Sequence, residues 1–297
     1  MDAWTWGEDS GGGSDGFGIM SKVEVRNLGS CLEVGRDGFL EKNVSKDLIQ
    51  PRWRPLVEKV IEFYRSEAGE NLLSVYVRGS VAKGSAVEFV SDLDSFCITK
   101  QKFRPSDEAC GRFRKLVQEE FPFCNGVELT GSSLELLEVL IAPKKRNIWQ
   151  ELIKTQSVCV FGKDLADQIQ AFELKDMVAH SYWIEREIET LPSKMRAAMA
   201  PNDSDDSVEQ LCTWIMKRVV RVGFEIVMLR ENKWTRDLYP CFESFSRYYP
   251  EKKSVMLKAV HLALNPSAKS EDTLELIDEF RPWLFEEIKT NVPGVSL

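Results

Sequence analysis

Residues 75–96, VYVRGSVAKGSAVEFVSDLDSF, carry an apolar run into a turn of small residues and then reach a pair of acids. The apolar run ends at Arg78-Gly79-Ser80, and eleven residues separate Ser80 from Asp92. Asp92 and Asp94 flank a single leucine. The stretch therefore predicts a strand, a tight turn that enters a short helix, and a second strand that begins near two carboxylates.

The turn is suited to phosphate. Gly79 has no Cβ, so that another group can approach the backbone closely. The first amides of the following helix point outward, and the helix dipole adds partial positive charge there. The Ser80 hydroxyl can donate to a phosphate oxygen and Lys83 can add a full charge. These residues predict a binding place for a nucleoside triphosphate.

The acids are suited to a divalent ion. Period-two alternation places Asp92 and Asp94 on one face of the second strand and Leu93 in the core. Two carboxylates so close together repel each other, and Mg²⁺ is a simple cation to offset them. Glu128, on a third predicted strand, can face the pair if these two strands are neighbours. With a triphosphate, the three carboxylates could hold two Mg²⁺ for an in-line displacement.

The surrounding elements predict an α/β (α+β) layer followed by an all-helical domain. Strands are expected at 71–77, 93–99 and 126–130, with helices at 55–67 and 106–121. Strand signals become rare after Ala142. Helices are expected there at 176–189, 208–231, 253–264 and 271–288, the last broken or kinked at Pro282. We expect three parts: residues 1–20 a disordered tail, 21–165 a catalytic domain, and 166–297 a helical acceptor-binding domain.

The combined pattern resembles the DNA polymerase β-like nucleotidyltransferase superfamily, and within it the small aminoglycoside and minimal enzymes. The resemblance is carried by Gly79, Ser80, Asp92, Leu93 and Asp94, and is supported by Ala82, Gly84 and Ser91. Two positions depart from the family pattern, because Arg78 and Ser95 each stand where an apolar residue is common. Glu128 replaces a commoner aspartate.

That resemblance implies a nucleotidyltransferase-fold mixed sheet and a Mg²⁺-dependent transfer of an NMP, in the first place AMP from ATP, to a hydroxyl of a small molecule. It implies Asp92, Asp94 and Glu128 as catalytic and metal-binding residues. Gly79, Ser80, Lys83, Ser91 and Lys217 are the expected nucleotide-binding residues. An enzyme acting on a protein or RNA acceptor and a catalytically silent binding module remain alternatives.

Charge and cysteine content narrow the class of protein. The chain of 297 residues has a net charge of −8, and removing the four acids of residues 1–20 leaves −4. An acidic surface disfavours an extended nucleic-acid interface without excluding a local one. Seven scattered cysteines and two histidines predict free thiols in a reducing, cytoplasmic compartment rather than a zinc site. No secretory signal and no membrane-spanning run is expected.

The predicted helix 208–231 leaves two readings open. Its Lys217, Arg218, Arg221 and Glu225 can form a solvated face with an Arg221–Glu225 pair. Alternatively, Lys217 or Arg218 reaches the triphosphate and Glu225 acts on an acceptor hydroxyl. Asp237 is a further candidate, as a polar anchor in an adenine or acceptor pocket, because it lies in a loop among aromatic residues.

Overall fold

The apolar runs around the opening stretch form the central strands of a four-stranded sheet. The computed structural model describes residues 29–139, 147–199 and 207–295. The sheet has the order β4-β3-β2-β5. Its strands are β2 (Leu72–Arg78), β3 (Leu93–Thr99), β4 (Val127–Ser133) and β5 (Ser157–Gly162). β3 runs parallel to β4 and antiparallel to β2, and β5 is antiparallel to β2, so the sheet is mixed, as expected.

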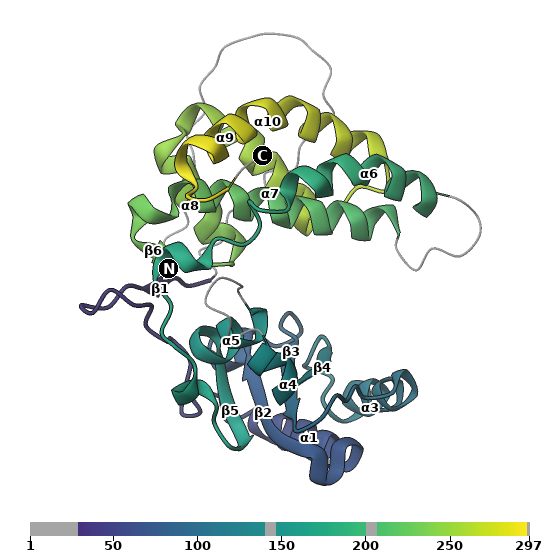
Figure 1. Cartoon of the computed structure of the whole chain (residues 1–297). Helices are drawn as coiled ribbons and strands as arrows, with labels where there is room; N and C mark the ends of the chain where they lie inside the picture. The colour runs from purple at the N-terminus through teal and green to yellow at the C-terminus, as the bar shows by residue number, and fades with distance from the viewer. Residues whose placement is uncertain (1–28, 140–146, 200–206, 296–297) are drawn as a thin grey trace.

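Helices cover both faces of this sheet (Figure 1). On one face, α1 (Arg54–Ala68) and α3 (Asp107–Glu120) share a core with Val75, Val77 and Leu93. The other face buries Tyr76, Phe96 and Ile98 under a smaller cluster. This second cover consists of α4 (Leu134–Val139), α5 (Ile148–Glu151) and the π-helical turn η2 (Leu152–Gln156). Alternating strand residues therefore feed two separate cores.

The second half of the chain is a helical bundle built around one long helix, α7 (Val208–Glu231). Ser207 and Gln210 form a capping box at its start, and Asn232 ends it in the left-handed conformation. The helices packed with it are α6 (Ile184–Ala198), α8 (Leu238–Tyr248), α9 (Lys253–Leu264) and α10 (Ser270–Asn291). The short turns are α2 (Gly79–Ala82), η1 (Gly69–Asn71), η3 (Ala166–Gln168), η4 (Leu174–Met177) and η5 (Pro250–Lys252). The expected fold class, a mixed α/β sheet with a helical second half, is confirmed.

The first described residues of the chain pack with the helical half. β1 (Leu32–Glu33) pairs antiparallel with β6 (Lys233–Trp234), and Leu32 is buried in the helical core. Phe39 forms an isolated bridge with Glu173. The chain therefore starts against the helical half and then crosses to the sheet, as Figure 1 shows. The expected tail, residues 1–20, lies outside the described residues.

Two expected helices and one strand differ between prediction and structure. β5 lies after Ala142, where strand signals become rare, and was not predicted. The expected helix 176–189 is wrong in its first part, because α6 begins only at Ile184. α10 continues through Pro282 without a break.

In the described part of the chain, no helix combines the length and apolar character needed to cross a membrane.

Candidate functional site

Three charged side chains meet where β2 ends and β3 and β4 begin. Arg78 lies opposite Asp94 in the register of β2 and β3, and Asp94 lies beside Glu128 in the register of β3 and β4. Arg78 Nη2 donates to Asp94 Oδ1 at 3.2 Å and also to Glu128 Oε2. The neighbouring strands therefore bring the predicted acids to one edge, which we call the acid corner (Asp92, Asp94 and Glu128).

The surroundings of the Asp94 carboxyl disfavour its negative charge. Burial raises its pKa to about 7, the nearby carboxyls of Glu128 and Asp92 add to the rise, and Arg78 acts in the opposite direction. A carboxyl in this setting gains from a further cation, because like charges in a partly desolvated place disfavour ionisation.

Gly79 is required by the close approach of a carboxylate in this structure. Its φ is +71°, and a Cβ at this position would lie 2.6 Å from Asp94 Oδ2. α2 is only one turn long and is closed by the Ser85 amide, which donates to the Ser80 carbonyl at 2.9 Å. The turn therefore begins directly beside the Asp94 carboxylate, with Ser80 as its second residue.

Two other predicted phosphate residues make contacts within the protein. Lys83 Nζ lies 2.9 Å from Asp237 Oδ2, across the two halves of the chain. The same Asp237 oxygen accepts from the Ser30 amide at 2.9 Å. Ser91 Oγ accepts from the Val87 amide at 2.9 Å and so closes the loop before Asp92. Asp237 is therefore a link between the halves of the molecule.

Lys217 approaches the acid corner from the helical half. It is half-buried on α7. Burial lowers its pKa, as does the charge of Arg221, whereas Asp92 raises it. Lys217 and Asp92 therefore lie within electrostatic reach of each other, so that α7 contributes a cation to the side of the acid corner that carries Asp92.

A second group of cations surrounds His180, which the sequence did not single out for function. Arg218 Nη1 donates to His180 Nδ1 at 2.9 Å, which leaves the ring proton on Nε2. Burial lowers the pKa of His180 to about 2, and the charges of Arg236, Arg221 and Arg218 act in the same direction. We call these three residues the arginine cluster (Arg218, Arg221 and Arg236).

Glu225 has neither of the roles expected for it. It is 5% exposed, and its carboxylate accepts from the amides of Ala179, His180 and Ser181 at 2.8–3.0 Å. The Ser181 hydroxyl donates to it as well, at 2.6 Å. The expected Arg221–Glu225 pair is wrong, since Arg221 Nε donates instead to the Arg236 carbonyl at 3.2 Å. These bonds also explain why the helix expected from Asp176 starts late: residues 179–181 give their amides to Glu225.

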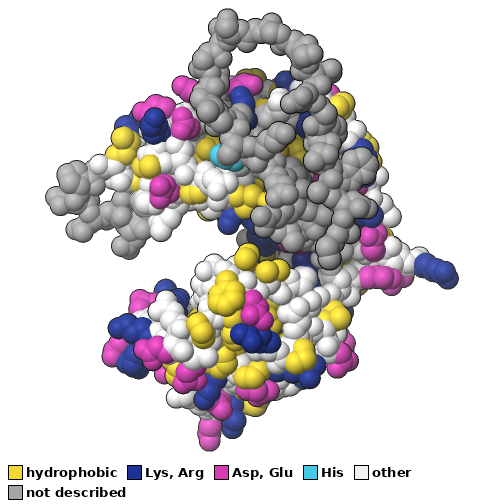
Figure 2. Space-filling view, turned by 180° about the vertical axis from the view of Figure 1, so that it is seen from behind, with side chains coloured by type: hydrophobic (Ala, Val, Ile, Leu, Met, Phe, Trp, Pro, Cys, Tyr) yellow, Lys and Arg dark blue, Asp and Glu magenta, His cyan; other side chains and the backbone are white. Residues whose placement is uncertain are grey.

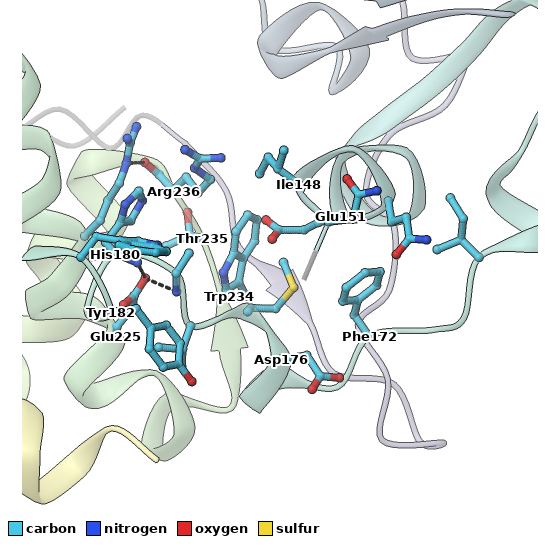
Figure 3. Close-up of a pocket in the computed structure, with 18 of the residues that line it drawn as sticks. Ile148, Glu151, Phe172, Asp176, His180, Tyr182, Glu225, Trp234, Thr235 and Arg236 are labelled. Atoms are coloured by element: carbon cyan, nitrogen blue, oxygen red, sulfur yellow. Dashed lines mark hydrogen bonds between the residues drawn. The ribbon is translucent and has the colours of Figure 1, made fainter. Parts of the chain in front are cut away.

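A large cavity of about 1400 Å³ separates the two halves beside the acid corner. Figure 3 shows His180, Glu225, Thr235 and Arg236 on its helical side, and Ile148 and Glu151 opposite them. From behind, Figure 2 shows the molecule deeply notched between the two halves. Of the residues singled out from the sequence, Arg218, Arg221 and Glu225 line this cavity, whereas Asp92, Asp94 and Glu128 do not.

The structure brings together Arg78, Gly79, Ser80, Asp94 and Glu128, with Asp92 and Lys217 close by. Sequence reasoning recognised Arg78 only as a departure from a pattern, and it missed His180 and Arg236. Arg78 could have been found, because period-two alternation places it on the same face as Tyr76, two residues from a predicted phosphate serine. His180 and Arg236 lie far apart in the chain and had no local signal.

No cluster of three or more His, Cys, Asp or Glu side chains able to hold a metal ion occurs among the described residues. The seven cysteines are all free, as expected, and six of them are buried.

Comparison with protein-family models gave no match, and comparison with curated protein sequences also gave none. Among solved structures, the chain is similar to the spectinomycin adenyltransferase AAD(9) from Enterococcus faecialis, determined with ATP and spectinomycin. The sequence identity is 14% and the TM-score is 0.45, and the match covers 80% of this chain and 99% of that chain. At that level of similarity, no residue of this chain takes its role from the neighbour.

Proposed function

We propose that this chain is a nucleotidyltransferase that moves an NMP, in the first place AMP from ATP, to a hydroxyl of a small molecule and releases pyrophosphate. One observation carries the proposal: Gly79, the residue before Ser80, lies directly against Asp94, while the strand register puts Glu128 beside Asp94. A triphosphate-binding turn that contacts carboxylates is suited to nucleotidyl transfer. That reaction depends mainly on alignment and charge compensation.

The turn at the end of β2 supports the nucleotide part of this proposal. Gly79 itself adds no side chain to the turn, and the Ser80 hydroxyl can donate to a phosphate oxygen. Lys217 brings a positive charge from α7 towards Asp92. Lys83 would join these groups only by leaving Asp237, so its part in binding depends on how the two halves close.

Asp92 and Asp94 fit one Mg²⁺. This ion is commonly held by one or two carboxylates together with the phosphate oxygens of a substrate, and does not need a cage of protein ligands. The lack of a three-ligand cluster in the described residues therefore agrees with an ion that arrives with its nucleotide. When bound there, Mg²⁺ supplies charge compensation for the triphosphate and acidifies the attacking hydroxyl.

Arg78 competes with a second ion. One oxygen of Asp94 and one of Glu128 already accept from the Arg78 guanidinium, so a cation shared by these two carboxylates would meet its positive charge. We therefore propose that Arg78 supplies a fixed positive charge between these carboxylates and that a single Mg²⁺ serves the reaction. The two-ion arrangement expected from the sequence would require Arg78 to move away.

The reaction itself asks little covalent chemistry of the protein. The acceptor oxygen forms a bond with the α-phosphorus and gives up its proton to solvent. The bond from that phosphorus to the bridging oxygen of the β-phosphate breaks, so that pyrophosphate leaves. The protein residues hold the triphosphate at Ser80, keep the acids aligned through the strand register, and exclude other geometries. Alignment of this kind accounts for a large part of many enzymatic rate enhancements.

The test is direct transfer of label. The full chain is incubated with ATP labelled on the α-phosphate, Mg²⁺ and pools of hydroxylated small molecules, and mass spectrometry identifies what gains a nucleotide. We expect one acceptor class to gain AMP with an equal release of pyrophosphate. Transfer of label to RNA or to a protein would mean that the acceptor is that macromolecule and not a small molecule. Failure of every nucleotide to bind in the presence of Mg²⁺ would contradict the proposal.

A further inference from the structure

The cavity between the two halves differs from the acid corner in its lining. Among the described residues, its wall includes Arg218, Arg221 and Arg236 but not Asp92, Asp94 or Glu128. Its volume of about 1400 Å³ is more than a small ligand needs. The cavity is thus a separate compartment beside the proposed reaction centre.

The arginine cluster gives this compartment an excess of positive charge on one wall. Arg221 and Arg236 are half-buried, and burial is the main cause that lowers the pKa of each. The charge of Arg236 helps to bring the pKa of Arg221 down to about 10, whereas Glu151 opposes the fall at Arg236. Both remain charged near neutral pH. Cations held this close in a partly desolvated wall are unfavourable unless an anion joins them.

Nearby carboxylates offset the cluster only in part. Glu151 lines the same cavity and raises the pKa of Arg236. Glu187 lies 3.1 Å from Arg218 Nε and neutralises that residue. Glu225 lines the same cavity, but its oxygens are taken by three amides and the Ser181 hydroxyl. Within the described part of the chain, Arg221 makes no ion pair, and its hydrogen bond to the Arg236 carbonyl uses only Nε.

One neutral donor strengthens the same preference. His180 stays uncharged and keeps its proton on Nε2, because its Nδ1 accepts from Arg218. Asn147 also lines the cavity, but its side-chain amide donates to Leu136 O and its side-chain oxygen accepts from the Trp149 amide. Arg236 lies on the side of the cavity towards the reaction centre, since Arg78 and Glu151 both influence its pKa.

We infer that this cavity binds the acceptor and that the acceptor carries a carboxylate or phosphate group, which Arg221 and Arg236 hold while its hydroxyl reaches the acid corner. The inference rests on the proposed function and names its substrate class. A guanidinium pair suits such groups because its donors match two oxygens at once. A polycationic acceptor would instead meet like charge on this wall.

An extended nucleic acid fits these observations less well. The cluster lies within a cavity wall and is half-buried, whereas a polyanion needs an exposed track of cations along a surface. A net charge of −8 for the whole chain also opposes a long electrostatic footprint.

The experiment compares four ligands built on one scaffold: glucose, glucosamine, glucose 6-phosphate and glucuronate. Binding is measured by calorimetry with the full chain, first alone and then saturated with Mg²⁺ and α,β-methylene-ATP. We expect the two anionic sugars to bind in both states, and at least about tenfold more tightly than glucose or glucosamine, since hydrogen bonds to charged groups contribute about 1.5–3 kcal/mol.

Variants test whether the arginine cluster is responsible for binding the anionic sugars. Arg221→Met should weaken the anionic sugars by about tenfold or more and leave the affinity for α,β-methylene-ATP within about twofold. Arg230→Met, on the same helix but stacked over Tyr248, is the matched control and should change neither. If Arg221→Met does not fold, Arg236→Met tests the same wall from a different element.

Two results would overturn the inference. Glucosamine could bind as tightly as the anionic sugars, or the nucleotide analogue could displace them, which would assign the arginines to the triphosphate. Failure of the analogue itself to bind with Mg²⁺ would contradict the proposed function instead, while the measurement without nucleotide would still report on the cavity.

Discussion

Gly79 and Asp94 lie so close that a single added carbon would not fit between them: a Cβ on Gly79 would stand 2.6 Å from Asp94 Oδ2. The first residue of α2 and the central residue of the acid corner are therefore in direct contact. Gly79 also has a φ of +71°, a conformation that other residues adopt only at a cost.

Gly79→Ala should therefore cost both stability and nucleotide binding. We expect a loss of about 1–3 kcal/mol in the free energy of unfolding from the unfavourable φ, and loss of ATP-analogue binding from displacement of Asp94. Gly38→Ala is the matched control, because Gly38 has a φ of +86° and nothing within 4 Å of its added Cβ. Equal affinity for nucleotide in the two variants, measured by calorimetry, would remove the Gly79–Asp94 contact from the site.

Asp92→Asn and Asp94→Asn should abolish Mg²⁺-dependent pyrophosphate release while leaving the fold intact. Losing an ion ligand removes several kcal/mol of charge stabilisation, so a fall of at least about 100-fold is expected. Asp107→Asn serves as a control, since that side chain is 93% exposed at the start of α3. Circular dichroism checks the fold, and full activity in both variants would defeat the assignment of the ion to these residues.

Ser80→Ala should weaken nucleotide binding more than it lowers the melting temperature. Its hydroxyl is proposed to donate to a charged phosphate oxygen, a bond that contributes about 1.5–3 kcal/mol, so the dissociation constant should rise roughly 10- to 100-fold. Ser85→Ala, an exposed serine at the end of the same turn, should leave the affinity unchanged. Equal affinities for the wild type and Ser80→Ala would exclude Ser80 from the site.

Arg78→Met should change how many ions bind. If the guanidinium fills the place between Asp94 and Glu128, the wild type should take up one Mn²⁺ with an ATP analogue and Arg78→Met should take up two. Electron paramagnetic resonance counts the bound ions, and metal should raise the melting temperature of the variant more than that of the wild type. Two ions in the wild type would mean that Arg78 leaves its place when nucleotide binds.

His180 predicts a particular loss of stability in acid. Its folded-state pKa is about 2 against an ordinary value of 6.5, so the unfolded chain takes up a proton below pH 6.5 and the folded chain does not. Relative to His180→Asn, the free energy of unfolding of the wild type should therefore fall by about 1.4 kcal/mol per pH unit below that value. Urea titrations between neutral pH and pH 5 measure the difference. Parallel curves for the two proteins would show that His180 is accessible to protons in the folded state.

Much of the fold follows from local patterns in the sequence. β3 and α7 have the bounds that periodicity and capping predict, and the Ser106 side chain caps α3 by accepting from the Ala109 amide at 3.1 Å. β5 was not predicted, because SVCVFG is short and follows a helical stretch. Its place in the sheet depends on pairing with β2. Short strands take their identity from their neighbours more than from their own residues.

The sequence alone determined the turn that brings Ser80 to Asp94 and the two faces of the strand that carries the acids, because spacing along the backbone sets both. Only the tertiary structure decided what those groups meet. Lys83 finds Asp237 at a separation of 154 residues, and the 179–181 amides find Glu225 at 44–46 residues. Such partners are selected by which buried polar groups need satisfying once the halves have packed, and no local pattern of residues encodes that need.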